Sequence, residues 1–201
     1  MTRPDTTPAR DRLIEATKQL VWQQGIEATS PGAILKASGV GQGSLYHHFS
    51  GKPELAAAAA TSLAADLQAE TDLLLGDDEL TPIDRVRAYL DKQRDAMRGC
   101  RLGRLAFDPG RDAQIAAPIA AYFTGLRRTL TGLLDHAIAA GELADTTDTG
   151  GVAAAIVAGV QGGYVLAAAT GDADAMAEAT RGLRHLLNAC TSNRPPNHPR
   201  R

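Results

Sequence analysis

The stretch GVGQGSLYHHFSGKPEL, residues 39–55, decides the fold of this chain. Its first two glycines flank a single valine, which is typical of a tight turn that buries one apolar side chain. Within residues 42–49, Leu45 and Phe49 are four positions apart, so both lie on one side of a helix. The letters SGKPE then mark the start of another helix. The stretch therefore predicts a turn, a short helix and the beginning of a longer one.

Two further helices are predicted before this stretch. A first amphipathic helix has apolar-face residues at helical spacing, and Gly25 follows it as a stop signal. Ser30 and Pro31 supply the N-cap and first residue of a short helix that Gly39 ends. Two short helices joined by a glycine turn and packed on a preceding helix form a helix-turn-helix, which places its last helix in the DNA major groove. The residues that set the first helix's face are Leu13, Ala16, Thr17, Leu20 and Val21.

In the last predicted helix of this motif, residues 42–49, small and polar side chains face away from the core. Short donors and acceptors suit base edges, a glycine permits close approach of the duplex, and a tyrosine hydroxyl reaches a phosphate. Two more candidates lie at helix N-termini, where free backbone N–H groups favour phosphate. The predicted DNA-binding residues are Ser30, Gln42, Gly43, Ser44, Tyr46, His47 and Lys52.

Residues 13–55, and above all residues 39–55, closely resemble the DNA-binding domain of TetR-family transcriptional repressors. Gly25, the helix-turn-helix, the cluster at residues 46–49 and Lys52 all lie in register with that family. The resemblance implies a homodimer on a near-palindromic operator. Gly32 departs from the pattern, because relatives often carry a polar or basic residue near it. By the same resemblance, the positions that touch DNA are Gln42, Ser44, Tyr46, His47 and Lys52.

Composition supports an all-α fold and gives little sign of a strongly basic DNA-binding surface. The chain has 201 residues, of which 44% are hydrophobic and 4% aromatic, and strong helix formers outnumber β-branched residues. The formal net charge is −2, and residues 1–55 carry six basic and five acidic side chains. DNA affinity is therefore expected to need two domains that bind together. The arm residues Arg3, Arg10 and Arg12 either add DNA contacts or form a solvated leader.

The cysteines and the N-terminus predict a cytoplasmic location. Cys100 and Cys190 are far apart and lack metal-ligand spacing, which favours reduced thiols. The first residues, MTRPDTTPARDR, lack the apolar core of a signal peptide. Residues 150–171 are mostly alanine and glycine, interrupted by Gln161, and we interpret them as a buried helix. No membrane partner is expected.

The chain is predicted to divide into residues 1–52, a helix-turn-helix DNA-binding domain with a flexible arm, residues 53–191, a helical effector-binding and dimerisation domain, and residues 192–201, a disordered basic tail. A loop is expected at residues 76–82. Helices are expected at residues 83–97 and 112–140, with a pause at residues 99–110 and a kink or restart at Pro118. A helix capped by Asp148 or Thr149 is expected at residues 151–169, and a last helix capped by Asp172 or Asp174 is expected up to about residue 188.

Small residues recur at every fourth position of the helix at residues 151–169. Such a stripe lets another helix approach closely, either from the same chain or from a second subunit. In the resembled family, the final two helices of each subunit form a four-helix dimer interface. The dimer interface expected here comprises Gly151, Ala155, Gly159, Gly163, Ala167, Leu183 and Leu187.

The resemblance also implies a cavity for a small molecule among the middle helices. Apolar and aromatic walls with a few polar groups suit a small apolar or amphipathic effector. Each candidate is also a plausible core residue. The candidates are Tyr89, Gln93, Met97, Phe107, Tyr122, Phe123, Leu126, Gln161 and Tyr164.

Three other classes of protein are alternatives to a DNA-binding regulator. An enzyme, or a helical small-molecule-binding protein without a DNA role, would need a different set of functional residues. His47 and His48 are adjacent and point different ways around a helix, and no nucleophile elbow, P-loop or dinucleotide fingerprint is present. A helical adaptor for proteins would leave the outward Ser44, Tyr46 and His47 without a role. We therefore expect a ligand-responsive repressor with no cofactor, metal site or catalytic residue.

Overall fold

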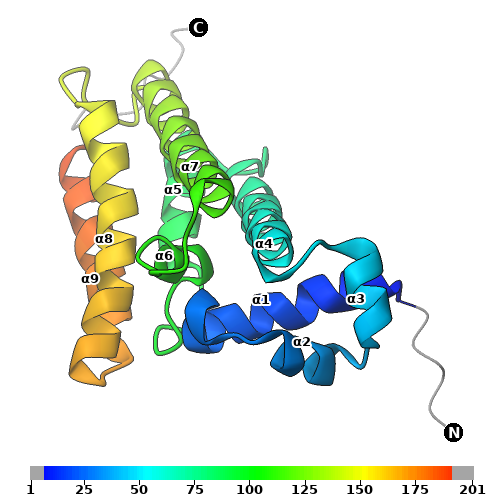
Figure 1. Cartoon of the computed structure of the whole chain (residues 1–201). Helices are drawn as coiled ribbons and strands as arrows, with labels where there is room; N and C mark the ends of the chain where they lie inside the picture. Colours follow the sequence, from blue (N-terminus) through cyan, green and yellow to red (C-terminus); the bar gives the residue numbers. More distant parts are fainter. Residues whose placement is uncertain (1–6, 192–201) are drawn as a thin grey trace, which may run out of the picture. The chain divides into compact units, whose positions relative to one another are not determined.

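The computed structural model describes residues 7–191 of the chain (Figure 1). These residues form helices and no strand, which confirms the all-α prediction, and Leu143 and Thr191 make an isolated bridge. The predictions for Arg3 and for the tail at residues 192–201 lie outside the described residues. The helices are α1 (Ala9–Ala28), α2 (Pro31–Ser38), α3 (Gln42–His48), α4 (Lys52–Leu75), α5 (Pro82–Asp91), α6 (Arg101–Leu105), α7 (Ala113–Ala139), α8 (Thr149–Thr170) and α9 (Asp174–Ala189).

The described residues group into two compact units. The first contains residues 7–67 and 100–122, and the second contains residues 68–99 and 123–191. Helices α4 and α7 each contribute residues to both units. The first unit therefore includes α6, which follows the helix-turn-helix by about 50 residues in the sequence.

The first unit is built around one apolar cluster that holds α1, α2 and α3 together. The turn between α2 and α3 has the predicted form, because Gly39 adopts a left-handed conformation with φ 63° and Val40 is buried beside it. Ser30 caps α2 by accepting a hydrogen bond from the Ala33 amide at 3.1 Å. The cluster comprises Leu13, Ile34, Val40, Leu45, Phe49 and Leu55.

Gly25 marks a kink in α1 where the sequence predicted its end. Its φ of 86° and ψ of 169° are not helical, yet a final helical turn continues to Ala28. The Ile26 amide just after the kink donates to Asp108 Oδ2 at 2.8 Å. The carboxylate of a distant residue thus caps this last turn, a contact that the local sequence does not reveal.

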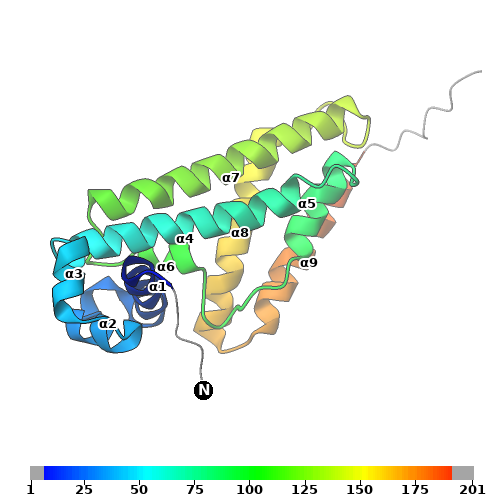
Figure 2. The same cartoon turned by 90° about the vertical axis from the view of Figure 1, so that its right-hand side faces the viewer.

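The second unit contains α5, α8 and α9. Helices α8 and α9 lie side by side and antiparallel (Figure 1), and α5 packs beside α9 (Figure 2). Arg87 of α5 bonds to the Asn188 side chain, and Arg184 of α9 forms an ion pair with Asp91 at 2.6 Å. A Cβ on Gly159 would meet Leu183 Cδ1 at 2.7 Å, so the close approach of α9 depends on a residue without a side chain.

Three expected boundaries in the second half of the chain need correction. The helix expected at residues 83–97 ends at Asp91. The Arg94 guanidinium caps this end by donating a hydrogen bond to the Leu90 carbonyl at 3.1 Å. The expected pause at residues 99–110 contains the short helix α6. Pro118 lies inside the continuous helix α7 and does not restart it. Asp148, one of the two predicted caps, caps α8 by accepting from the Gly151 amide at 2.9 Å. The prediction that Asp172 or Asp174 is the N-cap of α9 is wrong: Ala173 holds that position and makes no side-chain cap bond, while the Asp172 carboxylate accepts the Asp174 amide at 2.9 Å.

Among the described residues, α8 is long and apolar enough to cross a membrane, with a mean hydropathy of 1.8 over an 18-residue window. Length and composition alone also fit a core helix, so they are weak evidence for a span. The side of α8 that carries Ile156, Val160 and Ala167 is buried within the protein.

Candidate nucleic-acid interface

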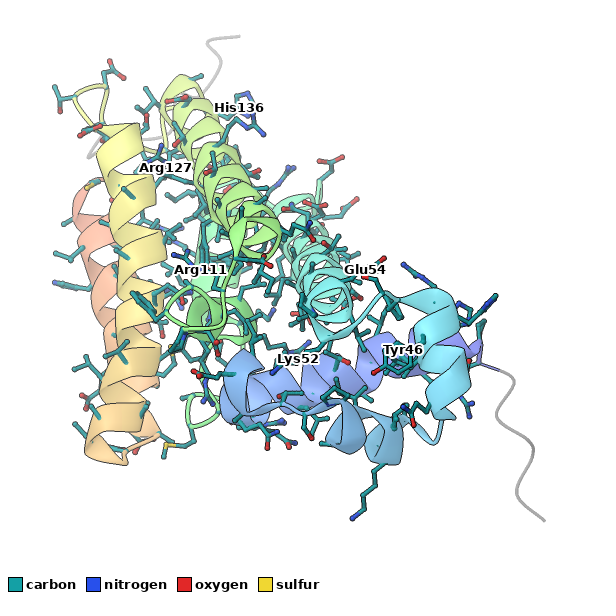
Figure 3. All side chains as sticks on the ribbon, in the orientation of Figure 1. Tyr46, Lys52, Glu54, Arg111, Arg127 and His136 are labelled. Carbon is teal, nitrogen blue, oxygen red and sulfur yellow. The ribbon has the colours of Figure 1, made fainter. Side chains whose placement is uncertain are left out.

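Helix α3 presents one buried side and one exposed side, as its sequence predicts. Leu45 and Phe49 are 2% and 3% exposed and fix the helix to the first unit's core. Tyr46 is 55% exposed (Figure 3), and Gly43 and His47 are also exposed. Ser44, which was expected to face outward with them, is only half-exposed, because it lies next to the buried Leu45. The helix can therefore offer short polar groups to a DNA groove without loosening its own packing.

The ends of α3 are held by contacts that support this orientation. The Ser44 amide donates to the Gly41 carbonyl at 3.0 Å, which closes the first turn. At the other end, the Arg10 guanidinium lies 5.5 Å from the centre of the Phe49 ring. Arg10, considered in the sequence as a possible DNA contact of the arm, thus packs on the helix-turn-helix itself.

Lys52 lies at the start of α4 and reaches back toward α1 (Figure 3). Its ammonium donates to the Glu27 carbonyl at 3.0 Å. An ammonium has three donors, so this bond leaves others available to a phosphate while fixing the direction of the side chain. The neighbouring Ser50 amide donates to Glu54 at 2.7 Å, and this hydrogen bond lowers the pKa of the Glu54 carboxyl.

Ser30 and its surroundings form a second part of the candidate interface. Ser30 is exposed, and its hydroxyl oxygen serves as the cap of α2. Gly32, the departure from the family pattern, lies in the first turn of α2, and a Cβ there would meet only Ser30 Oγ, at 3.9 Å. Lys36 in the last turn of α2 is exposed and was not among the predicted contacts. Its positive charge within the helix-turn-helix is the sequence signal that would have identified Lys36 as a candidate phosphate contact.

A charged triad joins α1 to α4 behind the candidate interface. The Lys18 ammonium lies 2.6 Å from a carboxylate oxygen of Glu15 and 2.6 Å from one of Asp66. Burial alone would lower the pKa of Lys18, but its hydrogen bonds to Asp66 and Glu15 outweigh burial, and the pKa is raised. The hydrogen bond from Lys18 in turn lowers the pKa of Glu15. Sequence analysis did not identify this triad.

The predicted effector residues are distributed over both units. Phe107 and Tyr122 belong to the first unit and the other seven to the second. Tyr89, Tyr122 and Leu126 are buried, whereas Phe107 and Met97 are exposed. Phe123, Gln161 and Tyr164 are half-buried, and Gln93 is exposed. The effector site remains a prediction. The buried and half-buried residues of the set are the ones best suited to line such a site.

The small residues predicted to form the dimer interface, at every fourth position of residues 151–167, do not stay on one face of α8. Gly151 and Ala155 are exposed. Gly159 and Gly163, in contrast, lie against Leu183 and Met176 of the same chain, and Ala167 and Leu187 are buried. Four residues advance a helix about 40° beyond a full turn, so a strict four-residue repeat drifts from the outer surface into the core. The second half of the stripe thus serves the packing of α8 on α9.

Nothing in the described part of the chain groups three or more His, Cys, Asp or Glu side chains in a way that could hold a metal ion. Cys100 is half-buried, and its sulfur caps α6 by accepting from the Gly103 amide at 3.3 Å. This local role accounts for its position in the fold.

The helix-turn-helix with an outward polar face defines a DNA-binding regulator. Residues 13–59 match the family described as bacterial regulatory proteins, tetR family, and residues 82–183 match the tetracyclin repressor-like C-terminal domain. The chain is 30% identical over 172 residues to the transcriptional regulator AcuR of Cereibacter sphaeroides, covering 82% of this chain and 78% of AcuR. The chain belongs to the TetR family of transcriptional regulators, and it is not an enzyme.

One further relative and two solved structures are also similar to this chain. The HTH-type transcriptional repressor DhaR of Mycobacterium sp. (strain GP1) is 26% identical over 104 residues, about half of each chain (51% and 52%). The crystal structure of the reduced form of E. coli NemR has a TM-score of 0.80 at 20% identity, covering 92% of this chain and 98% of NemR. The regulatory protein TetR from Rhodobacter sphaeroides has a TM-score of 0.76 at 22% identity, covering 92% and 100%. These two structures share the fold.

Proposed function

We propose that this regulator is a ligand-responsive repressor that binds a near-palindromic operator as a homodimer and leaves it when a small molecule binds. The observation that carries the proposal is the two-sided helix α3, anchored by Leu45 and Phe49 and exposing Gly43, Tyr46 and His47. Repression follows if the bound dimer blocks access to a promoter. The protein acts in the cytoplasm, where its operator DNA lies.

The DNA contacts divide by chemistry into two groups. Ser44 and His47, with Gln42, are suited to base edges in the major groove, because their short side chains donate and accept hydrogen bonds. Lys52, Tyr46 and Ser30 are suited to phosphates, which fix the register of the protein on the duplex. Gly43 permits close approach of the backbone.

The dimer surface is the exposed side of α8 and α9, which retains Gly151 and Ala155 from the predicted stripe. Small or apolar residues on this side recur with alternating spacings of four and three, which keeps them on one face. Within the described part of the chain, a Cβ on Gly162 or Gly182 would meet nothing within 4 Å, and Val165 and Leu186 are 64% and 65% exposed. A second subunit that covers this face would bury the apolar surface of α8, so no membrane is required. The exposed residues on this side are Gly151, Ala155, Ala158, Val165, Leu166 and Ala169 of α8, with Gly182, Leu186 and Ala189 of α9, and Gly162, which lies among them, is half-buried.

The effector is a small apolar or amphipathic molecule. Tyr89, Leu126 and Tyr164 supply apolar and aromatic surface in the second unit, and Gln161 supplies a polar group. Release of DNA requires that this molecule bind the free conformer more tightly than the operator-bound one.

The proposal is tested by measuring operator binding by fluorescence anisotropy at two salt concentrations, with duplexes from the gene's own upstream region or selected from random sequence. His47→Ala is expected to lower the preference for operator over competitor DNA by roughly 5- to 100-fold, the range of one good base contact. Lys52→Gln is expected to weaken both kinds of DNA alike and to reduce the salt slope by about 0.9 for each lost phosphate contact.

His136→Ala is the matched control, because His136 is an exposed histidine of α7 outside the helix-turn-helix (Figure 3). It should bind operator as the unmodified protein does. Failure of the unmodified protein to prefer any duplex, in either source of DNA, would overturn the proposed operator binding. Equal loss of preference in His47→Ala and His136→Ala would remove His47 from the base contacts.

A further inference from the structure

Asp108 connects two segments that are 82 residues apart in the sequence. Its Oδ2 accepts the Ile26 amide at 2.8 Å, and its Oδ1 accepts the Gly110 amide at 2.8 Å. Both carboxylate oxygens are therefore used, one on the last turn of α1 and one on the loop that carries Asp108 itself. Because the two amides bond to different oxygens, an asparagine, which has one acceptor oxygen and an NH₂ group, keeps at most one of these bonds in the same arrangement.

The absence of a side chain at the Gly25 kink lets the Asp108 carboxylate approach the backbone. A Cβ at position 25 would lie 2.6 Å from Asp108 Oδ2, and the backbone there has φ +86°, which L side chains rarely adopt. Only glycine thus allows both the kink and the approach of the carboxylate. The direction of the turn at residues 26–28 depends on Gly25 and Asp108 together.

The same turn holds Lys52. The carbonyl that accepts the Lys52 ammonium at 3.0 Å belongs to Glu27, the residue after Ile26. A cavity of about 390 Å³ adjoins this contact, and Lys52, Glu27 and Gly110 are among its lining residues. The Lys52 side chain thus lines this cavity, and its bond to the Glu27 carbonyl fixes its direction.

We propose that Asp108 is a positioning residue for operator binding: its carboxylate fixes the turn at residues 26–28, and the Glu27 carbonyl of that turn aims Lys52 at the DNA backbone. The inference rests on the proposed phosphate contact of Lys52. Asp108 itself does not touch DNA. Its negative charge would by itself repel phosphate, so a favourable effect on binding has to act through the position of Lys52.

The experiment compares Asp108→Ala, Lys52→Gln and the double variant in the full-length protein, with operator affinity measured from 50 to 200 mM salt. Asp108→Ala should weaken operator binding roughly threefold to tenfold at the lowest salt, as expected for a charged contact that is held less well. It should also reduce the salt slope by up to about 0.9 per subunit. The double variant should bind no more weakly than Lys52→Gln alone, because both changes remove the same contact.

Asp112→Ala is the control for charge and for loop structure. Asp112 lies in the same loop and lines the same cavity, and within residues 7–191 its carboxylate accepts only the local Ile115 amide, at 3.0 Å. Its removal should leave operator affinity and salt slope unchanged or slightly increase affinity, because one negative charge is lost. Asp108→Asn, which keeps one acceptor, should fall between the unmodified protein and Asp108→Ala, and it provides a measurement if the alanine variant does not fold.

Unchanged affinity and slope in both Asp108 variants would overturn the inference. Losses that add fully in the double variant would also overturn it, because Asp108 would then act independently of Lys52. If Asp108→Ala weakens binding and Lys52→Gln does not, Lys52 is not a DNA contact, and the inference is overturned because Asp108 cannot then act through it. Circular dichroism and thermal unfolding of each variant show whether the compared proteins are equally folded.

Discussion

At the scale of one residue, substitution of Gly43 is expected to change protein stability and operator affinity in opposite directions. A Cβ at this position would meet nothing within 4 Å, and Gly43 lies inside helix α3 on its exposed side. Gly43→Ala should therefore raise the free energy of unfolding by up to about 1 kcal/mol, because alanine is the better helix former. The same methyl group should weaken operator binding, roughly threefold to thirtyfold, by holding the duplex away.

Thermal unfolding and operator anisotropy measure these two effects on one preparation. Gly132→Ala in α7 is the control, because a Cβ there also meets nothing within 4 Å and Gly132 lies outside the helix-turn-helix. It should stabilise without changing operator affinity. If Gly43→Ala keeps full affinity, the duplex does not approach α3 at this position.

The orientation of α3 was predictable from its sequence because a short helix fixes the directions of its side chains by their spacing. Leu45 and Phe49 were expected to be buried and Gly43 and His47 exposed, and the structure confirms all four. The partner of Lys52 was not predictable, since the Glu27 carbonyl is 25 residues away and carries no signal in the side-chain sequence.

At the scale of helices, the Lys18 triad determines how α1 and α4 are joined. The Lys18 side chain is 10% exposed, while those of Glu15 and Asp66 are 56% and 42% exposed. Removing both carboxylates with Glu15→Gln and Asp66→Asn leaves a largely buried ammonium without a charged partner. This double variant should lose about 1–2 kcal/mol of unfolding free energy, a value reduced for the exposure of the carboxylates. Lys18→Met should lose less, because it also removes the buried charge.

The pH dependence of the triad follows from the directions of the two shifts. The pKa of Glu15 is lowered from 4.5, so its contribution is complete above pH 4.5 and is lost as the pH falls through the folded-state value. The pKa of Lys18 is raised from 10.5, so its contribution is complete below pH 10.5 and is lost above the folded-state value. Urea unfolding at pH 7 and at pH 3 should show a smaller difference between the unmodified protein and the double variant at pH 3. An equal difference at both values would contradict this account.

Helix boundaries show where local patterns were sufficient and where they failed. Ser30, Gly39 and Asp148 cap their helices as expected, because capping uses neighbouring residues. The end of α5 at Asp91 was missed, since the apolar spacing continues beyond it. The Arg94 guanidinium satisfies the carbonyls at that end, and its fold-back cannot be inferred from periodicity.

At the scale of the whole molecule, the proposed dimer surface on the exposed side of α8 and α9 leads to a prediction about the oligomeric state. Gly162→Glu places a charge on this side without a clash inside the chain, because nothing lies within 4 Å of a Cβ there. The variant should fold but dissociate at concentrations where the unmodified protein is a dimer, since a charge without a partner is costly in an interface. Its operator affinity should fall at least tenfold, because each subunit then binds one half-site alone.

Sedimentation equilibrium and operator anisotropy measure these outcomes. Ala168→Glu is the matched control, because Ala168 is an exposed residue of the same helix, about a quarter turn from the proposed face. It should remain dimeric. A dimeric Gly162→Glu would place the subunit contact on another surface and contradict the proposed interface.

The sequence alone determined the all-α fold, the helix-turn-helix and the faces of α3, because these depend on residues within a few positions of one another. Tertiary structure decided which neighbour covers each face. It placed Gly159 and Gly163 against α9 of the same chain, and it brought Asp108 to the amide of Ile26. The physical reason is range: helical spacing and capping are local, whereas the partner of a buried face or of a distant carboxylate is set only when the helices pack.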